Sequence, residues 1–119
     1  MTLVVALIPD LLFGSRVQAT LTQEGHEVRL LANQARLAGE LAGAEVLVVD
    51  LGAENLQLRE LLDELARSGG DPPPRTLGFY AHVDVDTRKR ALEEGFDLVV
   101  PRSRMAREGA QLVLRLAAS

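Results

Sequence analysis

The sequence contains no cysteine and no tryptophan, and its aromatic residues are limited to three phenylalanines and one tyrosine. Without cysteine, the chain has no disulfide bond and no thiolate ligand for a metal ion. No apolar run approaches the ~20 residues that a membrane-spanning helix needs, and no basic segment precedes a long apolar stretch, as it does in a secretory signal peptide. From these absences we expect a cytoplasmic protein that does not associate with a membrane.

Basic residues are in the minority, with 13 lysines and arginines against 17 aspartates and glutamates, which gives a net charge of −4. Proteins that bind nucleic acid generally carry a basic surface for the phosphates, so we expect no nucleic-acid partner. Hydrophobic residues make up 47% of the 119 positions, enough for one well-filled core. We therefore expect a single domain over residues 1–119.

Five apolar runs alternate with five segments of helical spacing. The runs are short and apolar on both faces, which predicts buried strands over residues 3–8, 28–31, 44–50, 76–80 and 96–101. The spacing of apolar residues between them predicts helices over residues 11–24, 33–43, 58–68, 84–95 and 103–118. This alternation indicates an α/β fold with one doubly wound, five-stranded parallel sheet. The strand order 2-1-3-4-5, in a flavodoxin-like three-layer α/β/α arrangement, fits five such units.

Short polar residues stand where several helices are expected to begin. Asp10, Asn33 and either Asp84 or Asp86 occupy such positions, and their side chains are well suited to cap a helix N-terminus. For Asp10, capping is the more economical interpretation and is compatible with metal binding. His26 precedes a short strand that we expect at the edge of the sheet, and we expect its side chain to be solvated.

The predicted strand order places one crevice among the strand ends. The chain reverses direction between the first and third strands, and ligands of such sheets bind at the carboxyl ends of the strands near the reversal. The crevice should therefore lie between Asp10 and Asp50. The fourth and fifth strands end nearby, which adds the residues Tyr80, Ala81, His82, Pro101, Arg102 and Ser103.

The two carboxylates of this crevice repel each other, and a proton, a divalent cation or a basic side chain relieves such repulsion. Mg²⁺ accepts carboxylate oxygens, which makes Asp10 and Asp50 candidate metal ligands. Arg102 is the alternative counter-charge, because a guanidinium can bridge to a carboxylate or bind a phosphoryl group through two parallel hydrogen bonds. Three further candidates for a switch or an anion site are Tyr80, His82 and Ser103.

The layout resembles the receiver domain of bacterial response regulators across essentially the whole chain. In that family an acidic pair follows the first strand, a phospho-accepting aspartate ends the third, a threonine or serine ends the fourth, and Lys-Pro ends the fifth. Asp50, in the run Val48-Val49-Asp50-Leu51, matches the acceptor, and Asp10 matches the second acid of the pair. The resemblance implies two-component phosphorelay signalling, Mg²⁺ as a cofactor, and a kinase or an effector as the protein partner.

The candidate site departs from the family pattern at several positions. Pro9 stands where the first acid of the pair would be. Tyr80 or Ala81, rather than a small hydroxyl residue, ends the fourth strand. Arg102 occupies the place of the lysine, and the proline precedes it instead of following it. The loop after Asp50 lacks the usual Met-Pro and glycine. The resemblance is therefore to a receiver with an atypical active site.

Three functions fit these residues. The leading hypothesis is a stand-alone receiver-like signalling module that acts through protein–protein contacts, with Asp50 as phospho-acceptor and Arg102 paired with the transferred group. The second, which the departures favour slightly, is a degenerate, phosphorylation-independent module in which Arg102 pairs permanently with Asp50 or Asp10. The third is a small flavodoxin-like enzyme or anion-binding domain using Asp10, Asp50, His82 and Arg102. The chain has no Gly-x-Gly-x-x-Gly motif and no P-loop, so we do not expect an enzyme. A second copy of the chain, forming a homodimer, is one alternative for the partner. The resemblance places the partner on the face formed by the fourth and fifth helices.

Overall fold

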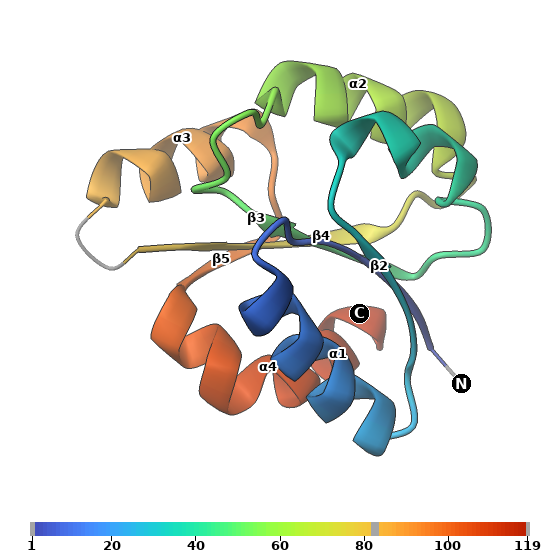
Figure 1. Ribbon diagram of the computed structural model, residues 1–119. Coiled ribbons are helices and arrows are strands. Elements are labelled where there is room, and N and C mark those ends of the chain that lie inside the picture. Colours follow the sequence, from blue (N-terminus) through green and yellow to red (C-terminus); the bar gives the residue numbers. More distant parts are fainter. Residues whose placement is uncertain (1, 82–83, 119) are drawn as a thin grey trace.

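The computed structural model describes residues 2–81 and 84–118. Strands and helices alternate along the chain (Figure 1), with bounds β1 Leu3–Leu7, α1 Leu11–Gln23, β2 Glu27–Leu31, the short 3₁₀ helix η1 Gln34–Gly39, β3 Val46–Asp50, α2 Leu58–Ser68, β4 Arg75–Tyr80, α3 Val85–Glu94, β5 Leu98–Pro101 and α4 Arg102–Ala117. No described helix has both the length and the apolar character that crossing a membrane requires.

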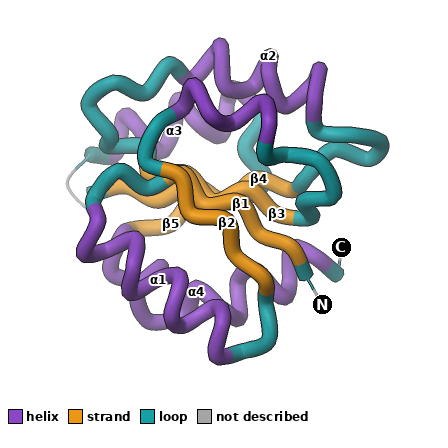
Figure 2. Tube along the Cα trace, turned by 45° about the vertical axis from the view of Figure 1, so that its right-hand side comes forward, coloured by secondary structure: helices purple, strands orange, loops and turns teal. Residues whose placement is uncertain are grey.

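The five strands form one parallel sheet in the order β2-β1-β3-β4-β5. This confirms the strand order and the three-layer fold class predicted from the sequence. Figure 1 shows η1, α2 and α3 on one face of the sheet and α1 and α4 on the other, and Figure 2 shows the same layers after rotation. The β1 and β3 strands lie side by side in the middle of the sheet, so both are covered on both faces.

Alternate residues of the central strands supply the two halves of the core. On one face Val5, Leu7 and Val49 pack with the leucines of α2. On the other face Val4 and Val48 pack with apolar residues of α1 and α4. Because consecutive strand residues point to opposite faces, an unbroken apolar run fills both layers. The continuous runs in the sequence therefore identified the buried strands correctly.

Three predicted helix caps are present. The Asp10 carboxylate accepts a hydrogen bond from the Phe13 backbone N–H at 3.0 Å, and Asn33 accepts one from the Ala35 N–H at 2.9 Å. Asp84, and not Asp86, caps α3 by accepting from the Thr87 N–H at 3.2 Å. Each bond satisfies a backbone donor that has no partner within its helix, and the Asp10 cap also fixes that side chain at the end of β1.

The helix predicted over residues 33–43 is wrong in type and length. The structure has only the 3₁₀ helix η1, which ends at Gly39. A helix this short is marginal by itself, and a glycine within it costs about 1 kcal/mol relative to alanine. Leu37 and Leu41 still reach the core and are fully buried. The guanidinium of Arg29 on β2 donates to the Glu40 carbonyl at 3.0 Å, which satisfies one of the backbone acceptors left at this end.

The expectation that His26 is solvated is also wrong, because its side chain is buried. Helix α1 ends at Gln23 and is followed by Glu24 and Gly25. The φ of Gly25 is 93° and lies in the left-handed region that glycine adopts most readily. The backbone N–H groups of Gly25 and His26 donate to the carbonyls of Thr22 and Leu21. This pattern is the Schellman motif, in which the residue after the glycine folds back against the last turn of the helix.

Candidate functional site

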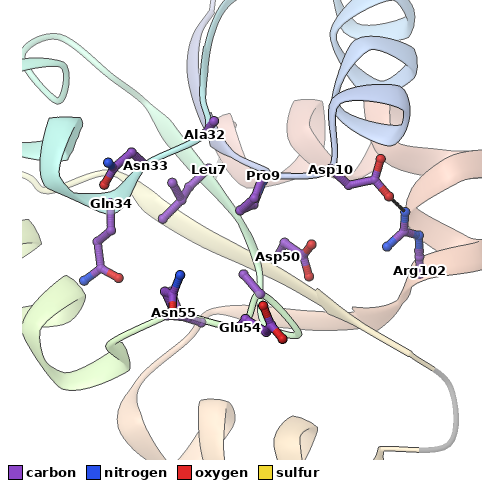
Figure 3. A pocket seen from close by; sticks show the side chains of 12 residues that line it. Leu7, Pro9, Asp10, Ala32, Asn33, Gln34, Asp50, Glu54, Asn55 and Arg102 are labelled. Atoms are coloured by element: carbon purple, nitrogen blue, oxygen red, sulfur yellow. Dashed lines mark hydrogen bonds and ion pairs between the residues drawn. The ribbon is translucent and has the colours of Figure 1, made fainter.

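Three of the predicted site residues line one cavity of about 500 Å³ at the carboxyl ends of the central strands. Asp10 follows β1, Asp50 is the last residue of β3, and Arg102 is the first residue of α4. In Figure 3 the Asp10–Arg102 pair lies on one side of the cavity, Asn33 and Gln34 lie on the other, and Asp50 lies between them. The parallel sheet brings these segments together because all its strands end at the same edge.

Both carboxylate oxygens of Asp10 are engaged. Oδ1 accepts the capping hydrogen bond from Phe13, and Oδ2 accepts one from Nη2 of Arg102 at 2.7 Å. These two bonds, the Phe13 N–H first and the Arg102 side chain second, lower the pKa of Asp10. Asp10 therefore stays ionised and paired under ordinary conditions.

The Arg102 guanidinium has a second contact, with an aromatic ring. Its central carbon lies 4.0 Å from the centre of the Phe13 ring, which is a cation–π arrangement. The Phe13 ring in turn packs against Phe79 of β4, with 5.1 Å between the ring centres, and Phe79 is fully buried. Phe13 thus connects Arg102 to the core. The sequence analysis did not single out Phe13, although its position three residues after Asp10 was the available signal.

Asp50 has a different environment from Asp10. Its residue surface is only 8% exposed, and Oδ1 accepts a hydrogen bond from the Gly52 backbone N–H at 2.9 Å. Burial raises the pKa of Asp50, and the negative charge of Asp10 adds to this, while the Gly52 bond and the charge of Arg102 oppose it. The surroundings therefore shift the pKa values of the two aspartates in opposite directions: the pKa of Asp10 is lowered and that of Asp50 is raised.

The side chains around Asp50 do not fit a resident Mg²⁺ well. In the described parts of the chain, no group of three acidic, histidine or cysteine side chains is placed to hold a metal ion. Asp10 already uses both oxygens, and Arg102 brings a positive charge to the position where a cation would bind. Pro9 offers no carboxylate. Mg²⁺ binding stays a prediction, and the arrangement of these ligands does not support it.

Two of the remaining predicted site residues, Tyr80 and Ser103, are not among the residues that line the cavity. Tyr80 is buried in the core beside Ala91 and Phe96, so it lies within the packing of β4 and not in the cavity. Ser103 is exposed in the first turn of α4 and does not line the cavity. His82 lies outside the described residues.

The structure adds residues to the site that the sequence did not single out. The wall is completed by Asn33, which caps η1, by Gln34 of η1, and by Glu54 and Asn55 from the loop after β3. The Gln34 side chain fixes these two segments together, because its amide accepts from the Gln57 N–H and donates to the Gln57 carbonyl, both at 2.9 Å. The signal for this wall was weak, since the pairing joins two short segments that have no periodic pattern.

No protein-family model matches the chain, and neither does any curated protein. Solved structures do match it. A response regulator receiver domain from Clostridium thermocellum superposes with a TM-score of 0.83 at 16% identity, covering 99% of this chain and 95% of that one. The non-phosphorylated HemR receiver domain from Leptospira biflexa gives 0.81 at 15% identity, with 100% and 96% covered. The receiver domain of the putative response regulator NarL from Mycobacterium tuberculosis gives 0.80 at 19%, with 99% and 97% covered. At these identities the likeness establishes the fold, and the receiver fold predicted from the sequence is confirmed.

Proposed function

We propose that this chain is a signalling module with the receiver fold, and that its Arg102–Asp10 pair replaces the metal ion of a phosphorylatable site. The observation that carries the proposal is the 2.7 Å hydrogen bond between the two side chains. Arg102 neutralises Asp10 with a charge that belongs to the protein, so the site needs no external cation at that position. In this arrangement the module signals through protein contacts and not through phosphorylation.

Asp50 keeps the place of the phospho-acceptor, but its surroundings disfavour that role. Phosphoryl transfer would replace the single negative charge of this carboxylate by the roughly two charges of an acyl phosphate, at a site that already holds Asp10. Arg102 is the one cationic residue among those that line the cavity, and it is already bonded to Asp10. The transferred group would therefore have to share the guanidinium with Asp10 or displace it.

The protein partner in this proposal is a kinase, an effector or a second copy of the chain. The edge of the sheet where α3 and α4 both contact β5 supports this, because α3 exposes two large apolar side chains on its outer surface. Val85 is 64% exposed and Leu92 is 38% exposed. They are seven residues apart, or two helical turns, and so lie on the same side of the helix.

An enzyme or a domain that binds anionic ligands is less well supported by the cavity. An anion would encounter the carboxylates of Asp10, Asp50 and Glu54, against the single guanidinium of Arg102. Like charges at this density repel an anionic substrate. We therefore retain the signalling module as the proposed function.

Intact-protein mass measurement after incubation with acetyl phosphate and Mg²⁺ tests the proposal. We expect no gain of mass in the wild type, in Asp50→Asn or in Asp63→Asn, which changes an exposed carboxylate on α2. A phosphate-sized gain in the wild type and in Asp63→Asn that is absent in Asp50→Asn would overturn the proposal, because Asp50 would then be a working acceptor.

A further inference from the structure

The cavity at Asp50 has a wall that a metal or phosphate site does not need. Its lining includes apolar side chains, contributed by Leu7, Ala32 and Leu56. The amide side chains of Asn33 and Asn55 also line it. A volume of about 500 Å³ is within the range of small-molecule sites, which combine apolar walls with a few placed polar groups. The wall is therefore suited to an organic ligand.

The charges of this cavity are not balanced by the protein. Asp10 is neutralised by Arg102 at 2.7 Å. Asp50 and Glu54 have no ion pair with any described residue. Arg102 acts on Asp50 only through its charge, so a single guanidinium on the lining stands against three carboxylates, and a cation from solution would offset the excess.

Asp50 is the more telling of the two because it is buried. One of its oxygens accepts from the Gly52 N–H, whereas the other accepts no hydrogen bond from any described residue. The side chain is more than nine-tenths buried and lines the cavity, where Figure 3 shows its carboxylate. No described side-chain oxygen is both buried and without a hydrogen-bond partner, so this second oxygen is open to the cavity, where a donor group can reach it.

We propose that this cavity binds a small organic molecule with a primary ammonium group, which donates to Asp50 while its carbon chain lies against Leu7 and Leu56. The inference rests on the proposed function, since it requires that Asp50 is not phosphorylated. An ammonium group has three donors. The second Asp50 oxygen and the Asn55 amide carbonyl are acceptors on the lining, and the Asn33 carbonyl, which already accepts from Ala35, has a second lone pair. Glu54 at the rim adds a second negative charge.

An organic ammonium ion fits this cavity better than a metal ion does. Mg²⁺ requires about six oxygen ligands in octahedral geometry and retains much of its water, so an apolar wall contributes nothing to its binding. The Leu7 and Leu56 side chains instead favour a ligand that has apolar surface to bury. Such a ligand would neutralise Asp50 and contact both η1 and the loop after β3, which gives the module an input signal in place of phosphate.

Amide NMR with n-butylamine as the probe tests the inference, and n-butanol, which has the same carbon chain without the charge, is the matched control ligand. We expect saturable shifts of the Gly52 and Asn55 amides with n-butylamine and little change with n-butanol. Asp50→Asn should weaken n-butylamine binding by about tenfold or more, since a charge-assisted hydrogen bond is lost. Asp63→Asn should bind as the wild type does. The amide spectrum outside the cavity reports that each variant is folded.

Equal binding of n-butanol, unchanged binding by folded Asp50→Asn, or shifts that do not saturate would each overturn the inference. The titration contains no phosphodonor and no Mg²⁺, so its failure is separate from that of the proposed function. Loss of the ammonium site with no phosphorylation would leave a module regulated by protein contacts alone. Phosphorylation of Asp50 in the mass assay would overturn the proposed function whatever the amine titration shows.

Discussion

Arg102 donates a hydrogen bond to Asp10 at 2.7 Å although the two residues lie 92 positions apart in the sequence. One is the first residue of the last helix, and the other caps the first helix. The bond therefore links the two helices that cover one face of the sheet. It also removes Asp10 from the set of free carboxylates beside Asp50, which is why the site differs from one built around a metal ion.

Arg102→Gln should raise the pKa of Asp10 without bringing it fully to its ordinary value. The larger cause of the lowered pKa is the hydrogen bond from the Phe13 N–H, which stays, and only the Arg102 contribution is removed. NMR titration of the Asp10 carboxyl carbon measures this. Arg104→Gln is the matched control, because Arg104 pairs with Glu108 within α4 at 3.4 Å and should leave Asp10 unchanged. If Asp10 had the same pKa in the wild type and in Arg102→Gln, Arg102 would not be the partner that lowers the pKa of Asp10.

Phe13→Ala and Phe13→Leu should separate packing from the cation–π contact. Loss of the ring should cost about 2 kcal/mol in the alanine variant, because Phe13 is only partly buried and large core truncations cost somewhat more. The leucine variant should lose less than about 1.5 kcal/mol, since it keeps most of the apolar volume. Urea unfolding measures both values.

Both Phe13 variants remove the aromatic face that lies 4.0 Å from Arg102. The guanidinium protons of Arg102 should therefore exchange with water faster in both variants than in the wild type. Slow exchange in Phe13→Leu would mean that the Asp10 bond alone holds Arg102 in place.

The sequence predicted the sheet, its strand order and the residues of three strand ends, because those features depend on strong local patterns and on general rules of parallel sheets. It could not predict that η1 is a 3₁₀ helix, since the four-residue spacing of Leu37 and Leu41 is that of an α-helix, whereas Leu41 lies beyond the end of η1 at Gly39. The burial of His26 depends on a backbone motif after Gly25, and the cavity wall depends on Gln34, which bonds to a segment distant in sequence. Such contacts are made by tertiary structure and leave no periodic signal.

Asp50→Asn should make the protein more stable at neutral pH, and the gain should shrink in acid. Burial raises the folded-state pKa of Asp50, so the folded state holds this proton to a higher pH than the unfolded state does. Wild-type stability then falls as pH rises from the unfolded pKa of about 3.9 through the raised folded pKa. Asparagine carries no charge, and its carbonyl can still accept from Gly52.

Urea unfolding of both proteins across this pH range measures the difference in free energy of unfolding. Asp63→Asn should show no comparable pH-dependent gain, because that carboxylate is exposed. A difference between wild type and Asp50→Asn that does not change with pH would argue against the ionisation of Asp50 as its cause.

Gly78→Ala should destabilise the sheet through Leu51, the residue that follows Asp50. A Cβ at position 78 would lie 2.6 Å from Cδ1 of Leu51 and 3.1 Å from the Phe96 ring, so both side chains must move. We expect a loss of about 1–3 kcal/mol, as is typical of overpacked cores. The double variant Gly78→Ala with Leu51→Ala should lose less than the sum of the single losses, because the second change creates the space that the first one needs. Additive losses in urea unfolding would show that Leu51 is not the obstacle.

Pro9→Asp combined with Arg102→Lys should create a Mg²⁺ site that the wild type lacks. The first change adds a carboxylate beside Asp10, and the second replaces the planar guanidinium by a flexible ammonium group that stacks less well on Phe13. Four carboxylates, those of Asp10, Asp50, Glu54 and the new side chain at position 9, would then border the cavity, and such an oxygen-rich set is what Mg²⁺ prefers. Calorimetric titration should show binding at least about tenfold tighter than in the wild type. Each single variant should gain less, because one leaves the guanidinium in place and the other lacks the added carboxylate beside Asp10. Adding Asp50→Asn should abolish the gain. Wild-type protein that binds Mg²⁺ as tightly as the double variant would mean that the Arg102–Asp10 pair opens readily for a metal, and the pair would then be a latch and not a replacement for the ion.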